Sequence, residues 1–193
     1  YRHGNSIKMS EWLDIPISQL KKNASEEFIK AVVAQRSYKS PEEILELHTA
    51  CTISAAMHFA VMSATTPGKS EQNLVGIVEG IASSGGGGLA YPVIMTKDGH
   101  TLHNHYHGNK LEKGQLVLGD FGGELESSYA SDINRTFPVD THFTDQQKAI
   151  YQIVLDAQMA AIEAIRPRIS FQEIHLLVME VIVEGLKAVG IMK

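Results

Sequence analysis

The sequence has one cysteine, few positive charges and no long apolar run. The single cysteine, Cys51, excludes an internal disulfide and fits a reducing compartment, so we expect a cytoplasmic protein. A formal net charge of -5 at pH 7 leaves no basic surface for nucleic acid. No apolar stretch is long enough to predict a membrane span. Nothing near Cys51 would favour a thiolate, so it is predicted to be a small buried residue.

The remaining composition is ordinary for a globular protein. Of 193 residues, 44% are hydrophobic and 20% are charged, which suffices for one sizeable domain with a core. The chain begins at Tyr1 rather than Met and stops at Lys193, directly after a predicted helix. We therefore expect both ends to be cut, and a targeting signal before Tyr1 would not be visible.

Most of the predicted helices have a recognisable capping residue at their N-terminus. Capping boxes predict helices that begin after Ser40, Thr144 and Ser170. Ser70 is predicted to cap a further short helix, and Gly190 to follow the last one. Near the N-terminus, residues 11–16 predict a short strand, and the apolar residues between 28 and 33 recur at helical spacing.

A β-hairpin with three histidines is predicted in the middle of the chain. Residues 89–96 form a strand pattern in which Pro92 indicates an edge or a bulge. A turn at Asp98-Gly99 should lead into a return strand over 101–104. His103 in this strand alternates with His105 and His107, which follow it. An extended backbone would place the three imidazoles on one face, as in a zinc site. The favoured alternative ends the strand near Asn104 and leaves His105 and His107 in a solvated loop.

Residues 116–139 carry two aspartates between two apolar runs. An antiparallel hairpin that turns at Glu126 would place Asp120 directly opposite Asp132, on the same face and about 5 Å away. Two ionised carboxylates at that distance repel by about 3 kcal/mol at an effective dielectric constant near 20. Either one is protonated or a cation binds between them, unless a bulge turns both toward water. The spacing alone leaves these possibilities open.

The residues around the two aspartates resemble a known motif. GDFGGE over 119–124 and YASDINRTFPV over 129–139 are similar to the metal-binding core of the aminopeptidase P, prolidase and creatinase family of pita-bread metallohydrolases. This resemblance implies that Asp120 and Asp132 are ligands of a dinuclear metal centre. Asn134 stands where many members carry Thr, a difference outside the ligands themselves.

The resemblance also implies the fold and its division. Residues 40–193 would be the N-terminal half of a pita-bread catalytic domain of the α/β (α+β) class, with helices packed on one side of a curved antiparallel sheet. Residues 1–39 would be the tail of an N-terminal domain and a linker.

The function implied is a metal-dependent aminopeptidase or dipeptidase that cleaves the bond before proline (Xaa-Pro). Two divalent metal ions, manganese by preference and cobalt or zinc otherwise, would activate a bridging hydroxide. His103 would contact the substrate and help to move a proton, and Tyr91 would line the substrate pocket. The partner would be a peptide with proline at its second position, and a homodimer is expected.

One departure from the family keeps a second class of function open. The family's other ligands, a His and two Glu, belong to the second half of the fold, and no residue after Asp132 stands in a matching context. The chain alone is therefore expected to be inactive. The alternative is a non-catalytic pita-bread binding module, and the residues that follow Lys193 in the parent protein would distinguish the two.

Overall fold

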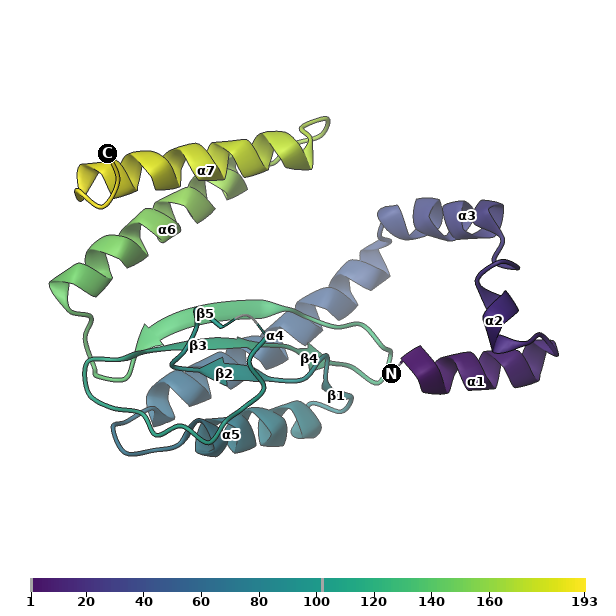
Figure 1. Ribbon diagram of the computed structural model, residues 1–193, viewed down its shortest axis with the longest axis horizontal. Helices are drawn as coiled ribbons and strands as arrows, with labels where there is room; N and C mark the ends of the chain where they lie inside the picture. The colour runs from purple at the N-terminus through teal and green to yellow at the C-terminus, as the bar shows by residue number, and fades with distance from the viewer. Residues whose placement is uncertain (1, 102) are drawn as a thin grey trace. The chain divides into compact units, whose positions relative to one another are not determined.

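The structure is a computed structural model that describes residues 2–101 and 103–193 (Figure 1). It contains two compact units, Tyr1–Glu46 and Leu47–Lys193. The division falls within one long helix, whereas the sequence places a domain boundary between residues 39 and 40. The assignment of the first part to a separate N-terminal domain stays a prediction.

The first unit is helical. It contains α1 (Arg2–Leu13), α2 (Ile17–Leu20) and α3 (Glu26–Ser37), followed by the start of α4. The strand predicted over residues 11–16 is wrong, because α1 runs to Leu13. A short apolar run fits a helix end as well as a strand, and here Pro16 only separates α1 from α2. The helix predicted around residues 28–33 is confirmed as α3.

Four longer helices supply the scaffold of the second unit: α4 (Pro41–Ala64), α5 (Glu71–Ser84), α6 (Asp145–Ala164) and α7 (Phe171–Ala188).

Their predicted starts are confirmed by hydrogen bonds. In each case the capping hydroxyl accepts from the backbone N–H three residues later, at Ser40, Ser70, Thr144 and Ser170. Gly190 follows α7 with φ 76°, as a C′ residue should.

Helix α4 is long and apolar. By length and hydropathy alone it is a candidate membrane span, contrary to the expectation that no stretch would qualify. A core helix has the same character, and α4 buries five residues: Ala50, Ser54, Met57, His58 and Val61. Cys51 lies outside this stripe and is exposed, so its predicted burial is wrong. One residue along a helix turns a side chain by about 100°, away from its buried neighbour.

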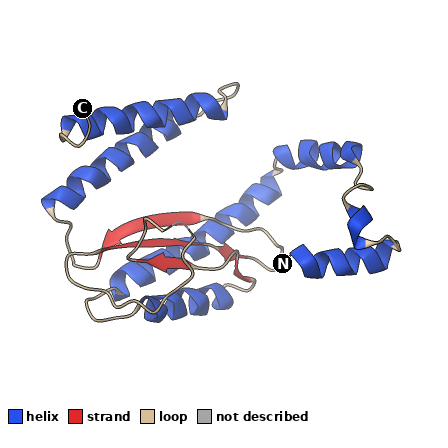
Figure 2. Ribbon diagram, in the orientation of Figure 1, coloured by secondary structure: helices blue, strands red, loops and turns tan. Residues whose placement is uncertain are grey.

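The strands form two small antiparallel sheets (Figure 2). The larger has the order β2-β3-β5, with β2 (Ile94–Thr96), β3 (Leu116–Phe121) and β5 (Ile133–Pro138). The smaller pairs β1 (Gly88–Leu89) with β4 (Gly123–Glu124).

The hairpin predicted between residues 89–96 and 101–104 is wrong, since β2 pairs with β3 instead. Its turn does form, with the Thr101 N–H donating to the Asp98 carbonyl at 2.8 Å. Leu102, within the predicted return strand, lies outside the described residues.

The two faces of the larger sheet differ in burial. Along β3, Val117, Gly119 and Phe121 are buried, while the residues between them are only partly covered. The buried face packs on α4 and α5, where it meets Met57, Val61, Leu74, Val75, Val78 and Ala82. Strand alternation therefore places Asp120 on the face that points away from these two helices.

The cap of α5 offers a test of these local signals. Replacing Ser70 with Ala removes the hydroxyl that accepts from the Asn73 N–H at 3.2 Å, so we expect the free energy of unfolding to fall by about 1 kcal/mol. Ser84→Ala at the other end of α5 is the matched control. It removes only an exposed bond to the Ile81 carbonyl and should change stability by less than about 0.5 kcal/mol. Urea denaturation measures both, and equal losses would contradict the capping role.

Candidate metal site

The hairpin that carries the two aspartates has a different register from the predicted one. Asp120 lies opposite Asn134, not opposite Asp132. The turn is centred on Ser127, one residue later than expected, and is closed by a bond from the Ser128 N–H to the Leu125 carbonyl at 2.8 Å. Moving the centre by one residue shifts each partner by two positions, which keeps side chains on the same face. Asp120 and Asp132 are therefore diagonal neighbours on one face.

Their carboxylates nevertheless meet at a third side chain. The phenol oxygen of Tyr91 lies 2.8 Å from Oδ1 of Asp120 and 2.8 Å from Oδ1 of Asp132. The two carboxylates thus converge although their backbones are not directly paired. Their convergence agrees with the prediction of a shared site, and their role as metal ligands stays a prediction.

Tyr91 reaches this position through a bulge between β1 and β2. Leu89 pairs with Gly123, and Ile94 pairs with Asp120. Between these two pairs the segment that contains Tyr91 advances five residues, whereas the opposite segment advances three. The two extra residues break the ladder beside Asp120 and turn Tyr91 toward it. Pro92 was the sequence signal for the bulge, but nothing in the sequence indicated that Tyr91 would bridge both aspartates.

The electrostatics around Tyr91 are those of a site with excess negative charge. Burial raises the pKa of the phenol, and the hydrogen bonds to Asp132 and Asp120 and their charges raise it further. A phenol has one hydrogen to donate, so it cannot neutralise two carboxylates. Oxygen ligands converging on one point suit a hard divalent cation.

The site is incomplete as a metal centre. Among residues 4–101 and 103–193, whose side chains the structure describes, no group of three or more His, Cys, Asp or Glu lies close enough to hold a metal ion. The residues present fit a metal as two carboxylate ligands and no more.

Gly122 allows the hairpin to close beside Asp132. A Cβ built on Gly122 would collide with the backbone carbonyl of Ser131. Its own carbonyl accepts from the Ala90 N–H at 2.9 Å, next to the Tyr91 bulge. The absence of a side chain at Gly122 therefore brings the two halves of the site together.

Two polar side chains of α4 contact the same hairpin from the buried face. Ser54 Oγ accepts from the Gly123 N–H at 2.9 Å and lies 2.6 Å from Ser131 Oγ. His58 Nε2 lies 2.9 Å from the Ile133 carbonyl, and its ring stacks on Phe121 with centroids 4.0 Å apart.

The environment of His58 is unusual for a core residue. Burial lowers the pKa of its imidazole and so favours the neutral ring. Because a carbonyl only accepts, Nε2 carries the hydrogen, and Nδ1 has no partner among the described residues. The sequence predicted a satisfied core histidine, and the structure satisfies only one of its two nitrogens.

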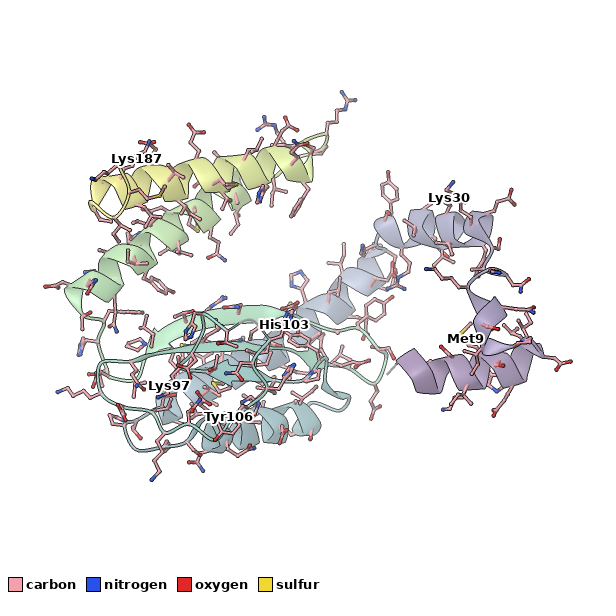
Figure 3. All side chains as sticks on the ribbon, in the orientation of Figure 1. Met9, Lys30, Lys97, His103, Tyr106 and Lys187 are labelled. Carbon is pink, nitrogen blue, oxygen red and sulfur yellow. The ribbon has the colours of Figure 1, made fainter. Side chains whose placement is uncertain are left out.

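The three alternating histidines do not form a metal site. His103 is exposed with φ 55°, in the long loop between β2 and β3 (Figure 3). Nδ1 of His105 and Nδ1 of His107 instead lie near the carbonyls of Val93 and Met95, at and beside β2. A zinc site formed by these three histidines is therefore wrong for the described residues. The loop predicted around His105 and His107 is confirmed. The role of His103 at the substrate stays a prediction.

A buried glutamate that the sequence did not reveal anchors this loop. Glu71 is fully buried and accepts from the Lys97 N–H at 2.8 Å and from Nδ2 of Asn109 at 3.2 Å. These bonds tie residues 97 and 109, on either side of His103 in the loop, to the start of α5. The loop is thus hydrogen-bonded to a buried side chain, while His103 itself is exposed.

A cavity of about 880 Å³ lies next to the site. Residues of β3, β5 and α6 line it, among them Asn134, the partner of Asp120, and Tyr151. Neither of the two aspartates, nor Tyr91 or His103, contributes to its lining. The cavity and the carboxylates are neighbours on the same face of the sheet rather than one pocket.

Comparison with known proteins identifies relatives for most of the chain. The model of metallopeptidase family M24 matches residues 46–191. The Xaa-Pro aminopeptidase of Escherichia coli is 37% identical over 163 residues, which cover 82% of this chain and 36% of that protein.

Two solved structures show the same likeness. The aminopeptidase PepP of Pseudomonas aeruginosa gives a TM-score of 0.83 at 31% identity. The match covers 98% of this chain and 45% of the PepP chain. A zinc-substituted E. coli aminopeptidase P in complex with product gives 0.77 at 36% identity, covering 81% and 36%. The predicted pita-bread fold is confirmed by these neighbours. The chain spans about a third of the length of the curated relatives it matches.

The tight approach at Gly122 leads to a stability prediction. Gly122→Ala should lower the free energy of unfolding by about 2 kcal/mol, because the new methyl group would push the Ser131 carbonyl away. Gly76→Ala, in the exposed interior of α5 with no atom within 4 Å of the new Cβ, is the control. It should raise stability by about 0.5 to 1 kcal/mol. Thermal and urea melts of the two variants would contradict the prediction if both were stabilised.

Proposed function

The chain belongs to metallopeptidase family M24, and from this premise we propose that it carries part of the active site of an Xaa-Pro aminopeptidase or dipeptidase. The observation that supports this most directly is the convergence of Asp120 and Asp132 on one point, at the phenol of Tyr91. The names of the relatives supply the reaction: release of an N-terminal residue that precedes proline. The substrate would be a peptide with proline at its second position.

Asp120 and Asp132 are the residues that would hold divalent metal. Carboxylate oxygens suit manganese, which we propose as the metal, although cobalt or zinc would also bind such ligands. The chemistry that a bound pair of cations supplies is activation of water for attack on a peptide carbonyl. Two carboxylates cannot fix two cations alone, so the remaining ligands would come from groups other than the described residues.

Other residues of the chain would orient the reacting groups. Tyr91, whose hydroxyl lies against both carboxylates, would hold their oxygens in place and form one wall of the substrate site. His103, exposed on a loop that Glu71 ties to the core, would contact the substrate carbonyl and move a proton. The protein would work in the cytoplasm as a homodimer.

A non-catalytic binding module with the same fold is the second candidate. It is favoured by one observation: the described residues place no third His, Cys, Asp or Glu beside the aspartate pair. Such a module would bind peptides without cleaving them. Its affinity would not depend on Asp120 or Asp132, which separates it from the enzyme.

Metal binding by residues 1–193 tests the role of the aspartates. In calorimetric titration with Mn²⁺, the chain should bind weakly, and Asp120→Asn or Asp132→Asn should weaken binding at least about tenfold, because each removes a charged ligand. Asp156→Asn is the matched control, since this exposed carboxylate on α6 accepts a hydrogen bond from the Gln152 side chain at 2.7 Å, far from the hairpin in sequence. The chain alone should release no N-terminal residue from an Xaa-Pro peptide. Binding unaffected by the first two variants would refute the proposed metal site.

The role of His103 is tested in an active protein that contains this chain. His103→Ala should lower turnover of an Xaa-Pro peptide about a hundredfold, because a proton-transfer group is lost, and leave metal content nearly unchanged. His100→Ala, an exposed histidine of the same loop, should change neither. Metal analysis beside the kinetic assay distinguishes the two effects. A parallel loss of metal would instead make His103 a ligand.

A further inference from the structure

The backbone around Asp132 is held by side chains of α4 as well as by the hairpin, in which the Ser131 N–H donates to the Gly123 carbonyl at 3.0 Å. Asp132 precedes the first residue of β5, Ile133, and so lies outside the regular ladder. The residue before it, Ser131, and the residue after it each form a hydrogen bond with α4. The residues on both sides of Asp132 therefore have two supports, the hairpin and α4.

The α4 residues that make these contacts form one stripe. Ala50, Ser54 and His58 are spaced four residues apart and therefore lie one above the other on the same helix face. Ser131 Oγ donates toward the Ala50 carbonyl at 2.9 Å and meets Ser54 Oγ at 2.6 Å. One turn further, His58 Nε2 donates to the carbonyl of Ile133 at 2.9 Å.

The same stripe also reaches the strand that carries Asp120. The ring of His58 stacks on Phe121, the next residue, at an interplanar angle of 18°. Phe121 and Ile133 are paired across β3 and β5. One imidazole therefore contacts both members of the pair that adjoins the two aspartates, on the opposite face of the sheet.

From this arrangement we propose that Ser54 and His58 are positioning residues, which set the place of Asp132 by fixing the backbone on either side of it. The inference rests on the proposed role of Asp132 as a metal ligand. Neither side chain touches the metal, the substrate or the carboxylates; both act through residues 131 and 133.

Packing alone does not account for these two residues. Ser54 is fully buried, and His58 is 3% exposed with one nitrogen unpaired among the described residues. An unpaired buried polar atom costs free energy, whereas an apolar side chain of similar size would fill the space without that cost. The cost is offset where a directed hydrogen bond is needed, and here the bonds are directed at the backbone of the site.

The test compares backbone exchange and metal affinity in residues 1–193. His58→Phe keeps an aromatic ring on Phe121 but removes the donor, and Ser54→Ala removes the hydroxyl. Each should speed amide hydrogen exchange at residues 131–133 about tenfold and raise the dissociation constant for Mn²⁺ about tenfold. His58→Gln, which keeps a side-chain donor, should recover part of both effects.

Thr65→Val is the matched control. Thr65, which directly follows α4, has a buried hydroxyl that donates to the Val61 carbonyl of that helix at 2.7 Å. Its loss should lower stability without changing exchange at residues 131–133 or Mn²⁺ affinity. Such a result would show that the effects at Ser54 and His58 do not follow from general loosening of the core.

Two outcomes would overturn the proposal. Unchanged exchange at residues 131–133 would mean that the α4 contacts do not hold this backbone, and faster exchange with unchanged Mn²⁺ affinity would reduce them to a structural role. If the unsubstituted chain bound no more Mn²⁺ than Asp132→Asn, the proposed function would fail instead. Hydrogen exchange, which needs no metal, would then still decide whether Ser54 and His58 position the segment.

Discussion

The carboxylates of Asp120 and Asp132 meet at one phenol, and the surrounding structure has to hold these two like charges together. At a separation near 5 Å and an effective dielectric constant near 20, their repulsion would be about 3 kcal/mol. One hydroxyl hydrogen cannot offset two negative charges. The convergence must therefore be imposed by the backbone, and it creates a place where a divalent cation is electrostatically favoured.

Three parts of the fold bring the two carboxylates together. A bulge between β1 and β2 turns Tyr91 toward the pair. Gly122 lets the hairpin close without a side chain in the way. On the buried face, α4 grips the residues on either side of Asp132 through Ser54 and His58. The exposed face is left free for chemistry, while the opposite face fixes the geometry. This division fits membership of a metallopeptidase family and the proposed Xaa-Pro cleavage.

Local signals in the sequence predicted what local interactions determine. The capping hydroxyls at Ser40, Thr144 and Ser170 bond to amides three residues away, so no distant contact can displace them. The strand predicted over residues 11–16 and the return strand over 101–104 failed for the opposite reason. A short apolar run fits a helix end as well as a strand, as at residues 11–13 of α1, and a strand pairs with the partner that the tertiary structure offers, as β2 does with β3.

The sequence by itself predicted that Asp120 and Asp132 share a face, and this holds in the structure because an error of two residues in register keeps strand parity. It also determined the family, through the long motif around them. Only the tertiary structure decided that Tyr91 lies between the carboxylates and that His58 bonds to the Ile133 carbonyl beside Asp132. Both depend on contacts between segments far apart in the chain. No local periodicity encodes such contacts, because the energy that selects them comes from packing the whole core.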